Sequence, residues 1–253
     1  MRFARAAVFF AAALAALAPQ AGRAFDASGG ADDCLLDKCA DHTDAAAATG
    51  VRPARAARGA RGTAGDFDFY VLALSWSPGF CRTPAGARAK SQCAPGGGLG
   101  FVTHGLWPQY ERGYPQFCPF GAQTPSRLAL QAAADVYPSE SLARYEWRKH
   151  GVCSGKSPTD YFADARRAMN MVVTPPAFLK PTQDQSWTRL DVERAFLAAN
   201  PRLRPGMIGV VCRGDALAEV RVCMTRDLRG FRACPELARP ACPPGAIVAP
   251  APL

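Results

Sequence analysis

Residues 67–76 have the sequence Phe67-Asp68-Phe69-Tyr70-Val71-Leu72-Ala73-Leu74-Ser75-Trp76. Apolar and polar side chains alternate at the start of this run, which then becomes continuously apolar, and this pattern predicts a β-strand. Ser77-Pro78-Gly79 follows directly and predicts the end of the strand. We therefore expect the folded part of the chain to begin near Asp66.

Downstream of this strand, the sequence predicts a short second strand, then helices, and then two more strands. The glycine- and proline-rich residues 81–100 predict a loop, and residues 101–103 predict a short strand that ends at His104. Ser126 and Ser139 are the expected N-caps of the first two helices. The expected helices cover 126–135, 139–150, 158–173 and 188–199, and the expected later strands cover 207–212 and 217–223. This order of elements predicts an α+β fold.

The first residues of the chain, 1–24, predict a secretory signal peptide. Arg2 and Arg5 precede an apolar run, and Gly22-Arg23-Ala24 has the small residues of a cleavage site. A membrane anchor is the alternative, but the apolar run is shorter than the ~20 residues that a membrane span requires. We therefore expect a periplasmic or secreted protein with no further contact with the membrane.

The next segment, residues 25–64, predicts a disordered linker because it lacks a sustained apolar period. His42 lies in this segment between aspartates, where a solvated histidine is favoured over a metal ligand. The folded domain is expected over residues 65–245. Residues 246–253 are expected to form a proline-rich, irregular tail.

The chain contains ten cysteines, and an even number in an exported protein predicts disulfides. Their spacing alone does not determine the pairing. A zinc site is the alternative, but the sequence has no Cys-x-x-Cys motif and no histidine pair at ligand spacing. Cys34 and Cys39 can pair with each other or remain separate.

The formal net charge is +9, and most of the excess lies after residue 64. A basic domain suits a polyanionic partner such as nucleic acid. The alternative is that arginine serves solubility only, and charge by itself does not separate the two interpretations.

Two of the three histidines lie in distinctive segments. His104 lies in Phe101-Val102-Thr103-His104-Gly105-Leu106-Trp107-Pro108, and His150 lies in Tyr145-Glu146-Trp147-Arg148-Lys149-His150-Gly151-Val152-Cys153. Lys149 and His150 follow Glu146 by three and four residues, so a helix brings this carboxylate, ammonium and imidazole to one face. We expect the helix C-terminus and Glu146 to favour the charged form of His150.

Together the two histidines predict acid–base chemistry on a phosphate. One imidazole can remove a proton while the other donates one, and Lys149 can offset charge on a phosphoryl oxygen. A solvated salt-bridge face on the helix is the alternative. Trp147 and Cys153 argue against it, because both suit a solvated face poorly. No carboxylate cluster suggests a metal ion, so no cofactor is expected.

These two segments resemble the two active-site segments of the ribonuclease T2 family. The usual form of the second is His-Glu-Trp-x-Lys-His-Gly-Thr-Cys, and the resemblance covers roughly residues 66–242. It implies an α+β fold with an antiparallel central sheet flanked by helices and tied by disulfides. The implied disulfides are Cys81–Cys93, Cys118–Cys153, Cys223–Cys234 and Cys212–Cys242.

The resemblance also implies a function, namely endonucleolytic cleavage of single-stranded RNA through a 2′,3′-cyclic phosphate by a monomer. It implies His150 as the base, His104 as the acid, and Glu146 and Lys149 as groups that polarise the phosphate. Trp107 and Tyr114 would stack on a base. Another interpretation is a zinc or redox protein, which predicts bound metal or reactive thiols.

Two departures from the family pattern affect substrate binding. Tyr145 stands where the family has a third histidine, so we expect weaker phosphate binding rather than loss of the reaction. Gln109 stands where some relatives have an aspartate that binds adenine, which leaves the base preference open. The main alternative is therefore an RNA-binding or toxin-like module with impaired catalysis. The joint presence of His104, Glu146, Lys149 and His150 argues against this alternative.

Overall fold

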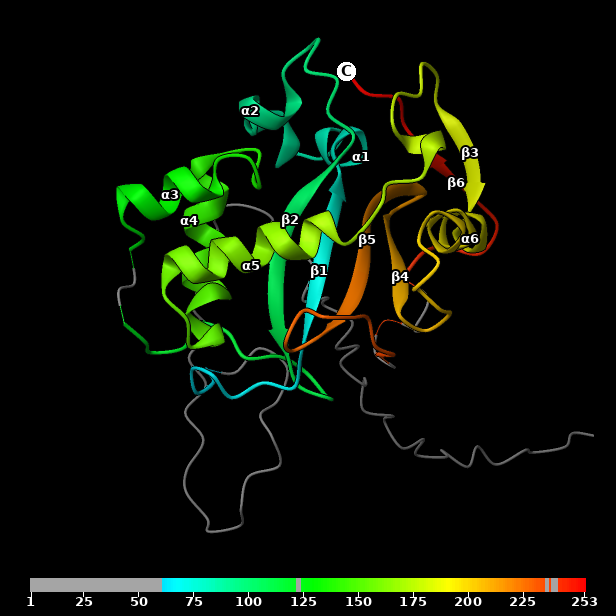
Figure 1. Ribbon diagram of the computed structural model, residues 1–253. Coiled ribbons are helices and arrows are strands. Elements are labelled where there is room, and N and C mark those ends of the chain that lie inside the picture. The colour runs from blue at the N-terminus through cyan, green and yellow to red at the C-terminus, as the bar shows by residue number, and fades with distance from the viewer. Residues whose placement is uncertain (1–60, 122–123, 235–236, 238–240) are drawn as a thin grey trace, which may run out of the picture. The chain divides into compact units, whose positions relative to one another are not determined.

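A computed structural model of the protein describes residues 61–121, 124–234, 237 and 241–253 (Figure 1). The expected signal peptide, Cys34, Cys39, His42 and the expected linker before residue 61 lie outside the described residues. The folded part begins earlier than Asp66. Arg61 forms a β-bridge with Gln116, and the Gly65 amide donates a 2.9 Å hydrogen bond to the carbonyl of Cys153.

One sheet organises the described part of the chain. Its strands are β1 (Phe69–Trp76), β2 (Phe101–Gln109), β3 (Gln185–Thr188), β4 (Ile208–Arg213), β5 (Ala216–Thr225) and β6 (Ala246–Ala249). The strand order is β2-β1-β5-β6-β3, and β4 also pairs with β5. The predicted α+β fold with an antiparallel central sheet is confirmed, and the one parallel pair among the described strands joins β6 to β5. Residues 226–245 supply the long connection that a parallel pair needs.

The predicted first strand lies inside the sheet. All eight residues of β1 are buried, because β2 and β5 pair with its two edges. Burial on both faces explains why its sequence is continuously apolar rather than strictly alternating. β2 is longer than the three residues predicted and carries the chain from Phe101 through His104 to Gln109.

The helices begin largely where capping residues predict them. They are α1 (Ser77–Cys81), α2 (Lys90–Cys93), α3 (Arg127–Ala133), α4 (Glu140–Lys149), α5 (Pro158–Asn170) and α6 (Arg189–Ala199). The side chains of Ser126, Ser139, Ser157 and Thr188 each accept a hydrogen bond from a backbone amide in the first turn. The expected loop over 81–100 contains α2. None of the described helices is long and apolar enough to span a bilayer.

The expectation of an irregular C-terminal tail is wrong. β6 pairs with β3 in antiparallel register, with Trp187 opposite Ile247, and Ile247 is fully buried. Beyond β6, the Trp76 indole donates a 3.0 Å hydrogen bond to the carbonyl of Pro250. Burial of Ile247 and of the Trp76 side chain therefore holds this segment to the sheet, although prolines surround it.

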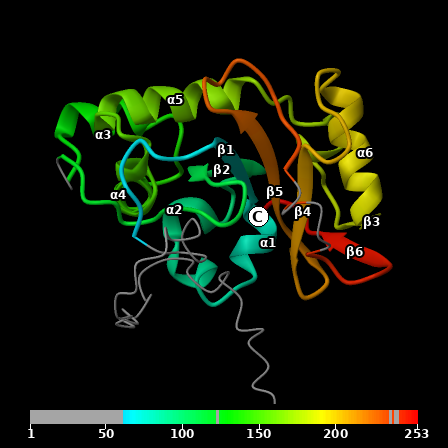
Figure 2. The ribbon, with the colours of Figure 1, turned by 90° about the horizontal axis from the view of Figure 1, so that it is seen from below.

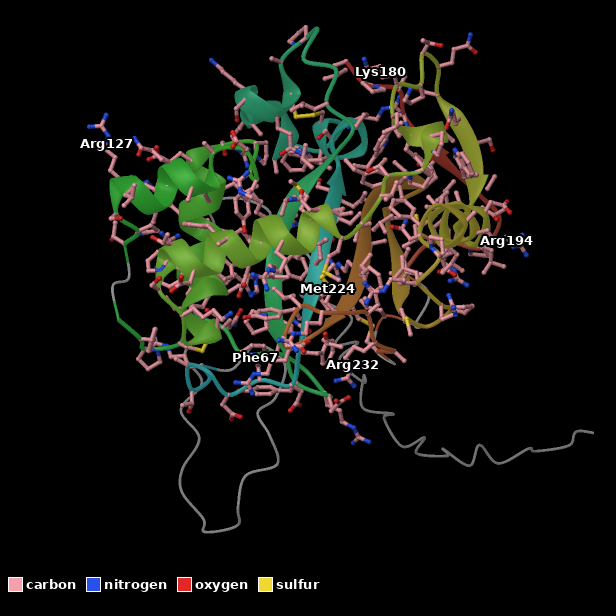
Figure 3. The ribbon with its side chains drawn as sticks, in the orientation of Figure 1. Phe67, Arg127, Lys180, Arg194, Met224 and Arg232 are labelled. Carbon is pink, nitrogen blue, oxygen red and sulfur yellow. A yellow bond between two sulfur atoms is a disulfide. The ribbon has the colours of Figure 1, made fainter. Side chains whose placement is uncertain are left out.

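Helix α5 crosses β2 and β1 on one face of the sheet (Figures 1 and 2). Its Tyr161 and Phe162 are fully buried against Trp147 of α4, and the Tyr161 hydroxyl donates to the carbonyl of Leu106 in β2. Met224 of β5 is also fully buried in the sheet. In contrast, the side chains of Arg127, Lys180 and Arg194 point outward (Figure 3). The contacts of Tyr161 and Phe162 fix α4 and β2 relative to each other. These two elements supply the candidate site.

Candidate active site

His104 lies at an irregularity in β2. Opposite β1, Gly105 pairs with Ala73 and Thr103 pairs with Leu74, so His104 is the extra residue of a β-bulge. Bulges change the direction of a side chain and are common beside active sites. The bulge places the imidazole in a buried environment, where only 9% of His104 is exposed.

Gly105 lets β2 approach α4 closely. The Glu146 carboxylate lies directly over Gly105, and a Cβ atom at this position would overlap both that carboxylate and the Trp107 indole nitrogen. The indole nitrogen donates a 2.8 Å hydrogen bond to Oε2 of Glu146. Glu146 itself is almost fully buried, so the missing side chain at Gly105 makes room for a carboxylate within the site.

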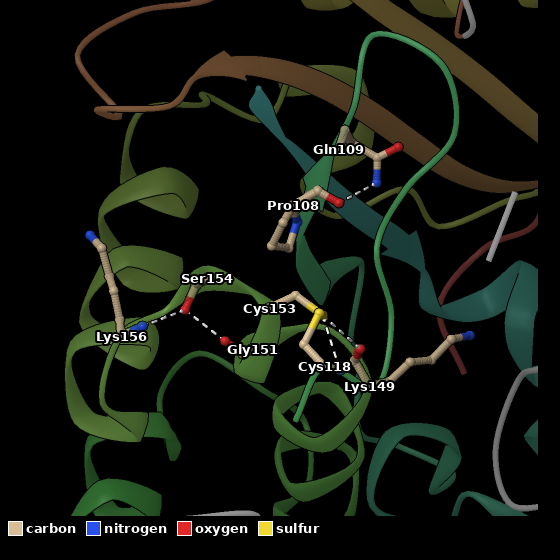
Figure 4. The surroundings of a disulfide bond; sticks show 8 residues. All are labelled: Pro108, Gln109, Cys118, Lys149, Gly151, Cys153, Ser154 and Lys156. Atoms are coloured by element: carbon tan, nitrogen blue, oxygen red, sulfur yellow. Dashed lines mark hydrogen bonds between the residues drawn. A yellow bond between two sulfur atoms is a disulfide. The ribbon is translucent and has the colours of Figure 1, made fainter. Parts of the chain in front are cut away.

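Helix α4 supplies the other predicted groups. Glu146 and Lys149 lie in its last turns, and His150 is its C-cap, whose amide donates to the Glu146 carbonyl. Directly after the helix, the Cys118–Cys153 disulfide joins this segment to the chain that follows β2 (Figure 4). The Phe117 amide also donates a 2.8 Å hydrogen bond to the carbonyl of Lys149. One disulfide and one backbone hydrogen bond therefore hold the end of α4 close to the segment that follows β2.

The four disulfides among the described residues are Cys81–Cys93, Cys118–Cys153, Cys212–Cys242 and Cys223–Cys234. These are the same four pairs that the family resemblance implies. A native disulfide typically stabilises a small exported domain by about 2–5 kcal/mol.

The Trp107 indole contacts both imidazoles. Its ring centroid is 5.2 Å from that of His104, edge to face, and 5.3 Å from that of His150, at an interplanar angle of 32°. The two imidazoles thus lie against the same indole ring, which brings the two histidine segments together in one site.

His104 faces two carboxylates. Its Nδ1 lies 2.5 Å from Oε1 of Glu219, and its Nε2 lies 3.6 Å from Oε1 of Glu146. Burial disfavours the imidazolium, but Glu219 and then Glu146 outweigh burial and raise the pKa of His104 above its ordinary value. His104 therefore holds its proton to a higher pH than an ordinary histidine does.

His150 has the opposite electrostatic environment, and the expectation that its charged form is favoured is wrong. Burial lowers its pKa well below the ordinary value, and the positive charges of Lys149, His104 and Arg221 lower it further. The Glu146 carboxylate is directed to Trp107 and His104 instead. Among the described residues, Nδ1 of His150 has no hydrogen-bond partner. His150 is therefore suited to accept a proton.

Glu146 and Lys149 also respond to burial. Burial raises the pKa of Glu146, and His104, Trp107 and Lys149 offset part of that rise. Burial lowers the pKa of Lys149, and Glu146 opposes this change. The four predicted catalytic side chains thus form one electrostatically coupled group, in which Lys149 is half-buried and the other three are buried.

Of the predicted substrate-binding residues, Trp107, Tyr114 and Tyr145 lie beside this group. The Tyr114 ring centroid is 6.3 Å from that of His150. Gln109 ends β2, and its side-chain amide donates to the carbonyl of Pro108 (Figure 4). Tyr145 is buried on α4, with the Lys149 ammonium 5.6 Å from its ring centroid. Trp107 is more enclosed than a simple base-stacking residue, because the Arg221 guanidinium also covers its ring at 5.1 Å.

Glu219 and Arg221 are functional-site residues that the sequence did not identify. Both lie on β5, and Arg221 donates hydrogen bonds of 2.9 and 2.8 Å to Oε2 of Glu219 through Nε and Nη2. The alternating pattern of residues 217–223 places them on one strand face, but it does not indicate what that face contacts. No group of three or more residues suited to a metal ion occurs within the described ranges.

Comparisons with known proteins find ribonucleases among the relatives of this chain. A ribonuclease from Aeromonas hydrophila is 50% identical over 98 residues, which cover 39% of this chain and 43% of that protein. A probable ribonuclease from Haemophilus influenzae is 32% identical over 148 residues, or 53% of this chain and 54% of the relative. The chain therefore spans about half the length of these two curated relatives.

Solved structures show the same fold. An RNase-related protein from Calystegia sepium matches with a TM-score of 0.56 and 21% identity, over 74% of this chain and 97% of that chain. RNase NT, solved in complex with 5′-AMP, matches with a TM-score of 0.53 and 21% identity, over 74% and 100%. The family model described as Ribonuclease T2 family matches residues 67–234, which include both histidine segments and Glu219. The chain belongs to the ribonuclease T2 family.

Proposed function

We propose that this chain is an endoribonuclease that cleaves single-stranded RNA by using the 2′-hydroxyl group as the nucleophile. The observation that carries this proposal is the pair of imidazoles that contact Trp107, one beside two carboxylates and the other beside cations. Such a pair separates an acid from a base within one site, as proton transfer in both directions requires.

In the first step, His150 takes the proton of the 2′-hydroxyl, and the oxygen attacks the adjacent phosphorus. The bond from phosphorus to the 5′-oxygen breaks, and Nε2 of His104 donates a proton to that oxygen. The products are a 2′,3′-cyclic phosphate and a 5′-hydroxyl. In the second step, water opens the cyclic phosphate, with His104 now taking a proton and His150 returning one. DNA lacks the 2′-hydroxyl and is not a substrate.

Charge on the phosphate increases in the transition state, and Lys149 is placed to offset it. Burial raises the pKa of Glu146, so it takes up a proton at higher pH than an ordinary glutamate does. When protonated, it can donate a hydrogen bond to a phosphoryl oxygen in addition to accepting one from Trp107. All of these groups come from the chain itself, so the reaction needs no metal ion or other cofactor.

Base recognition in this proposal is broad. Tyr114 and the exposed part of Trp107 offer aromatic surface, and stacking on aromatic rings tolerates every base. Gln109 carries an amide that both donates and accepts, so it does not select one base edge. Four disulfides support function in an oxidising compartment, in agreement with the proposed signal peptide and export to the periplasm or medium.

The test is incubation of polyuridylate with the purified protein in excess EDTA, from about pH 4 to about pH 8. The proposal predicts shorter fragments with 2′,3′-cyclic phosphate ends that convert slowly to 3′-phosphates. Intact RNA that remains bound to the protein across this range would instead support an RNA-binding module with impaired catalysis. Cleavage that stops in EDTA would contradict the metal-independent mechanism.

Tyr145→His is expected to increase kcat/KM at mildly acidic pH by on the order of tenfold, because a charged imidazole strengthens a hydrogen bond to phosphate. The gain should disappear above the pKa of the new histidine. Tyr145→Phe is the matched control, since it removes the hydroxyl without adding charge and should give no gain at any pH. An unchanged pH profile in Tyr145→His would show that this position does not contact phosphate.

A further inference from the structure

We infer that Glu219 is a positioning residue for His104, which holds the imidazole through Nδ1 and directs Nε2 toward the reacting phosphate. This inference rests on the proposed function and extends it to a residue outside both histidine segments. It starts from the 2.5 Å approach of Glu219 Oε1 to His104 Nδ1, between two buried residues.

The sheet brings these two residues together across an intervening strand. Glu219 on β5 pairs with Ser75 of β1, and His104 lies at the bulge beside Ala73 on the other edge of β1. Side chains of paired residues share a face of the sheet, so Ala73 and Ser75 lie between the imidazole and the carboxylate. Because both residues are small, the His104 side chain can reach Glu219 over β1.

Arg221 fixes the carboxylate in turn. Its guanidinium binds Oε2 of Glu219 through two nitrogens and leaves Oε1 for His104. The same guanidinium covers the ring of Trp107, which donates to Glu146. Arg221 therefore contacts the proposed acid, His104, through Glu219. It also contacts Glu146 through Trp107. Such support fixes the tautomer and orientation of a histidine.

The tautomer follows from this geometry. A carboxylate only accepts hydrogen bonds, so Nδ1 of His104 must carry a hydrogen that it donates to Glu219. The proton that leaves during the reaction is therefore the one on Nε2, which lies on the side of Glu146. The charged and titratable groups that interact with His104 are Glu219 and Arg221 from β5, Glu146 from α4, and His150 at the C-cap of α4.

The test compares Glu219→Gln with a matched control, Glu111→Gln, which removes the same charge from an exposed ion pair with Arg232. Glu219→Gln is expected to lower kcat by roughly tenfold to a hundredfold, with little change in KM. Loss of the carboxylate also destabilises the imidazolium of His104. The alkaline limb of the pH profile should therefore move to lower pH by about one to three units, and the acidic limb, which belongs to His150, should stay in place.

Two further variants distinguish positioning from a purely structural role. Glu219→Asp retains the charge and should keep the alkaline limb near its original pH, although kcat falls. Arg221→Gln removes a cation near His104 and should move that limb to higher pH, the opposite direction, so the inference remains testable if Glu219→Gln does not fold. If the alkaline limb of the pH profile lies at the same pH in Glu219→Gln, in Arg221→Gln and in the unmodified protein, the inference is overturned.

An NMR titration of the His104 ring separates this inference from the proposed function. If the protein does not cleave RNA, the proposed function fails, but the titration still measures the pairing. The inference predicts a lower His104 pKa in Glu219→Gln than in Glu111→Gln, and a Glu219-dependent downfield Nδ1 proton. The same pKa in both variants would contradict it whether or not RNA is cleaved.

Discussion

His150→Ala is expected to reduce kcat for RNA cleavage by 10²- to 10⁴-fold, on the order of what a positioned general base contributes. His150 lies within 5.3 Å of Trp107, and burial and nearby cations keep its pKa well below the ordinary value. It is therefore neutral over most of the pH range and ready to accept the 2′-hydroxyl proton. Its loss should also remove the acidic limb of the pH profile, where protonation of His150 inactivates the enzyme.

The control is His42→Ala, which removes the chain's third histidine, outside both active-site segments. This variant should retain full activity, and His150→Ala should keep the thermal midpoint of the unmodified protein within a few degrees. Initial rates on polyuridylate and thermal unfolding measured by circular dichroism test both statements. A folded His150→Ala protein with nearly normal rates would remove His150 from the mechanism.

Gly105→Ala is expected to lower kcat by about a hundredfold, because misplacement of a catalytic group by ~1 Å costs about that much. The Gly105 backbone is outside the left-handed region, so alanine suits its conformation. The effect is therefore steric: the new methyl group would overlap the Glu146 carboxylate and the Trp107 indole nitrogen. Glu146 must shift away from Trp107 and His104, and overpacking of this kind also destabilises a fold by about 1–3 kcal/mol.

Gly230→Ala is the matched control. Among the described residues, a Cβ atom at residue 230 would meet the Arg202 guanidinium alone, at 3.5 Å, an ordinary contact at the far end of a flexible side chain. This variant should keep both rate and stability. The measurement is kcat, KM and the unfolding free energy for both variants. An active Gly105→Ala enzyme with unchanged KM would mean that Glu146 need not occupy its present place.

The local parts of the fold could be predicted from the sequence. Serine caps and helical spacing locate α3 and α4 to within a few residues, because these signals depend on neighbours in the chain. The strands β3 and β6 could not be predicted, because each has only four residues and is stabilised by a partner far away in the sequence. Ile247 has no local feature that indicates its burial.

The site was predictable to the same extent. The two histidine segments are continuous in sequence and carry His104, Glu146, Lys149 and His150 together. Glu219 lies 115 residues from the histidine that it contacts, and only the sheet order reveals the pair. The protonation of His150 was also beyond the sequence. Helix position and Glu146 suggested a favoured charge, whereas burial decides the sign.

The most direct measurement uses a DNA oligonucleotide that contains one ribonucleotide, incubated with the protein in EDTA and analysed by mass spectrometry. The account predicts a single cut after the ribonucleotide, with a 2′,3′-cyclic phosphate on one product and a 5′-hydroxyl on the other. The same oligonucleotide with a 2′-O-methyl group at that position should stay intact. Cleavage of the methylated strand, or products with 5′-phosphate ends, would contradict attack by the 2′-hydroxyl.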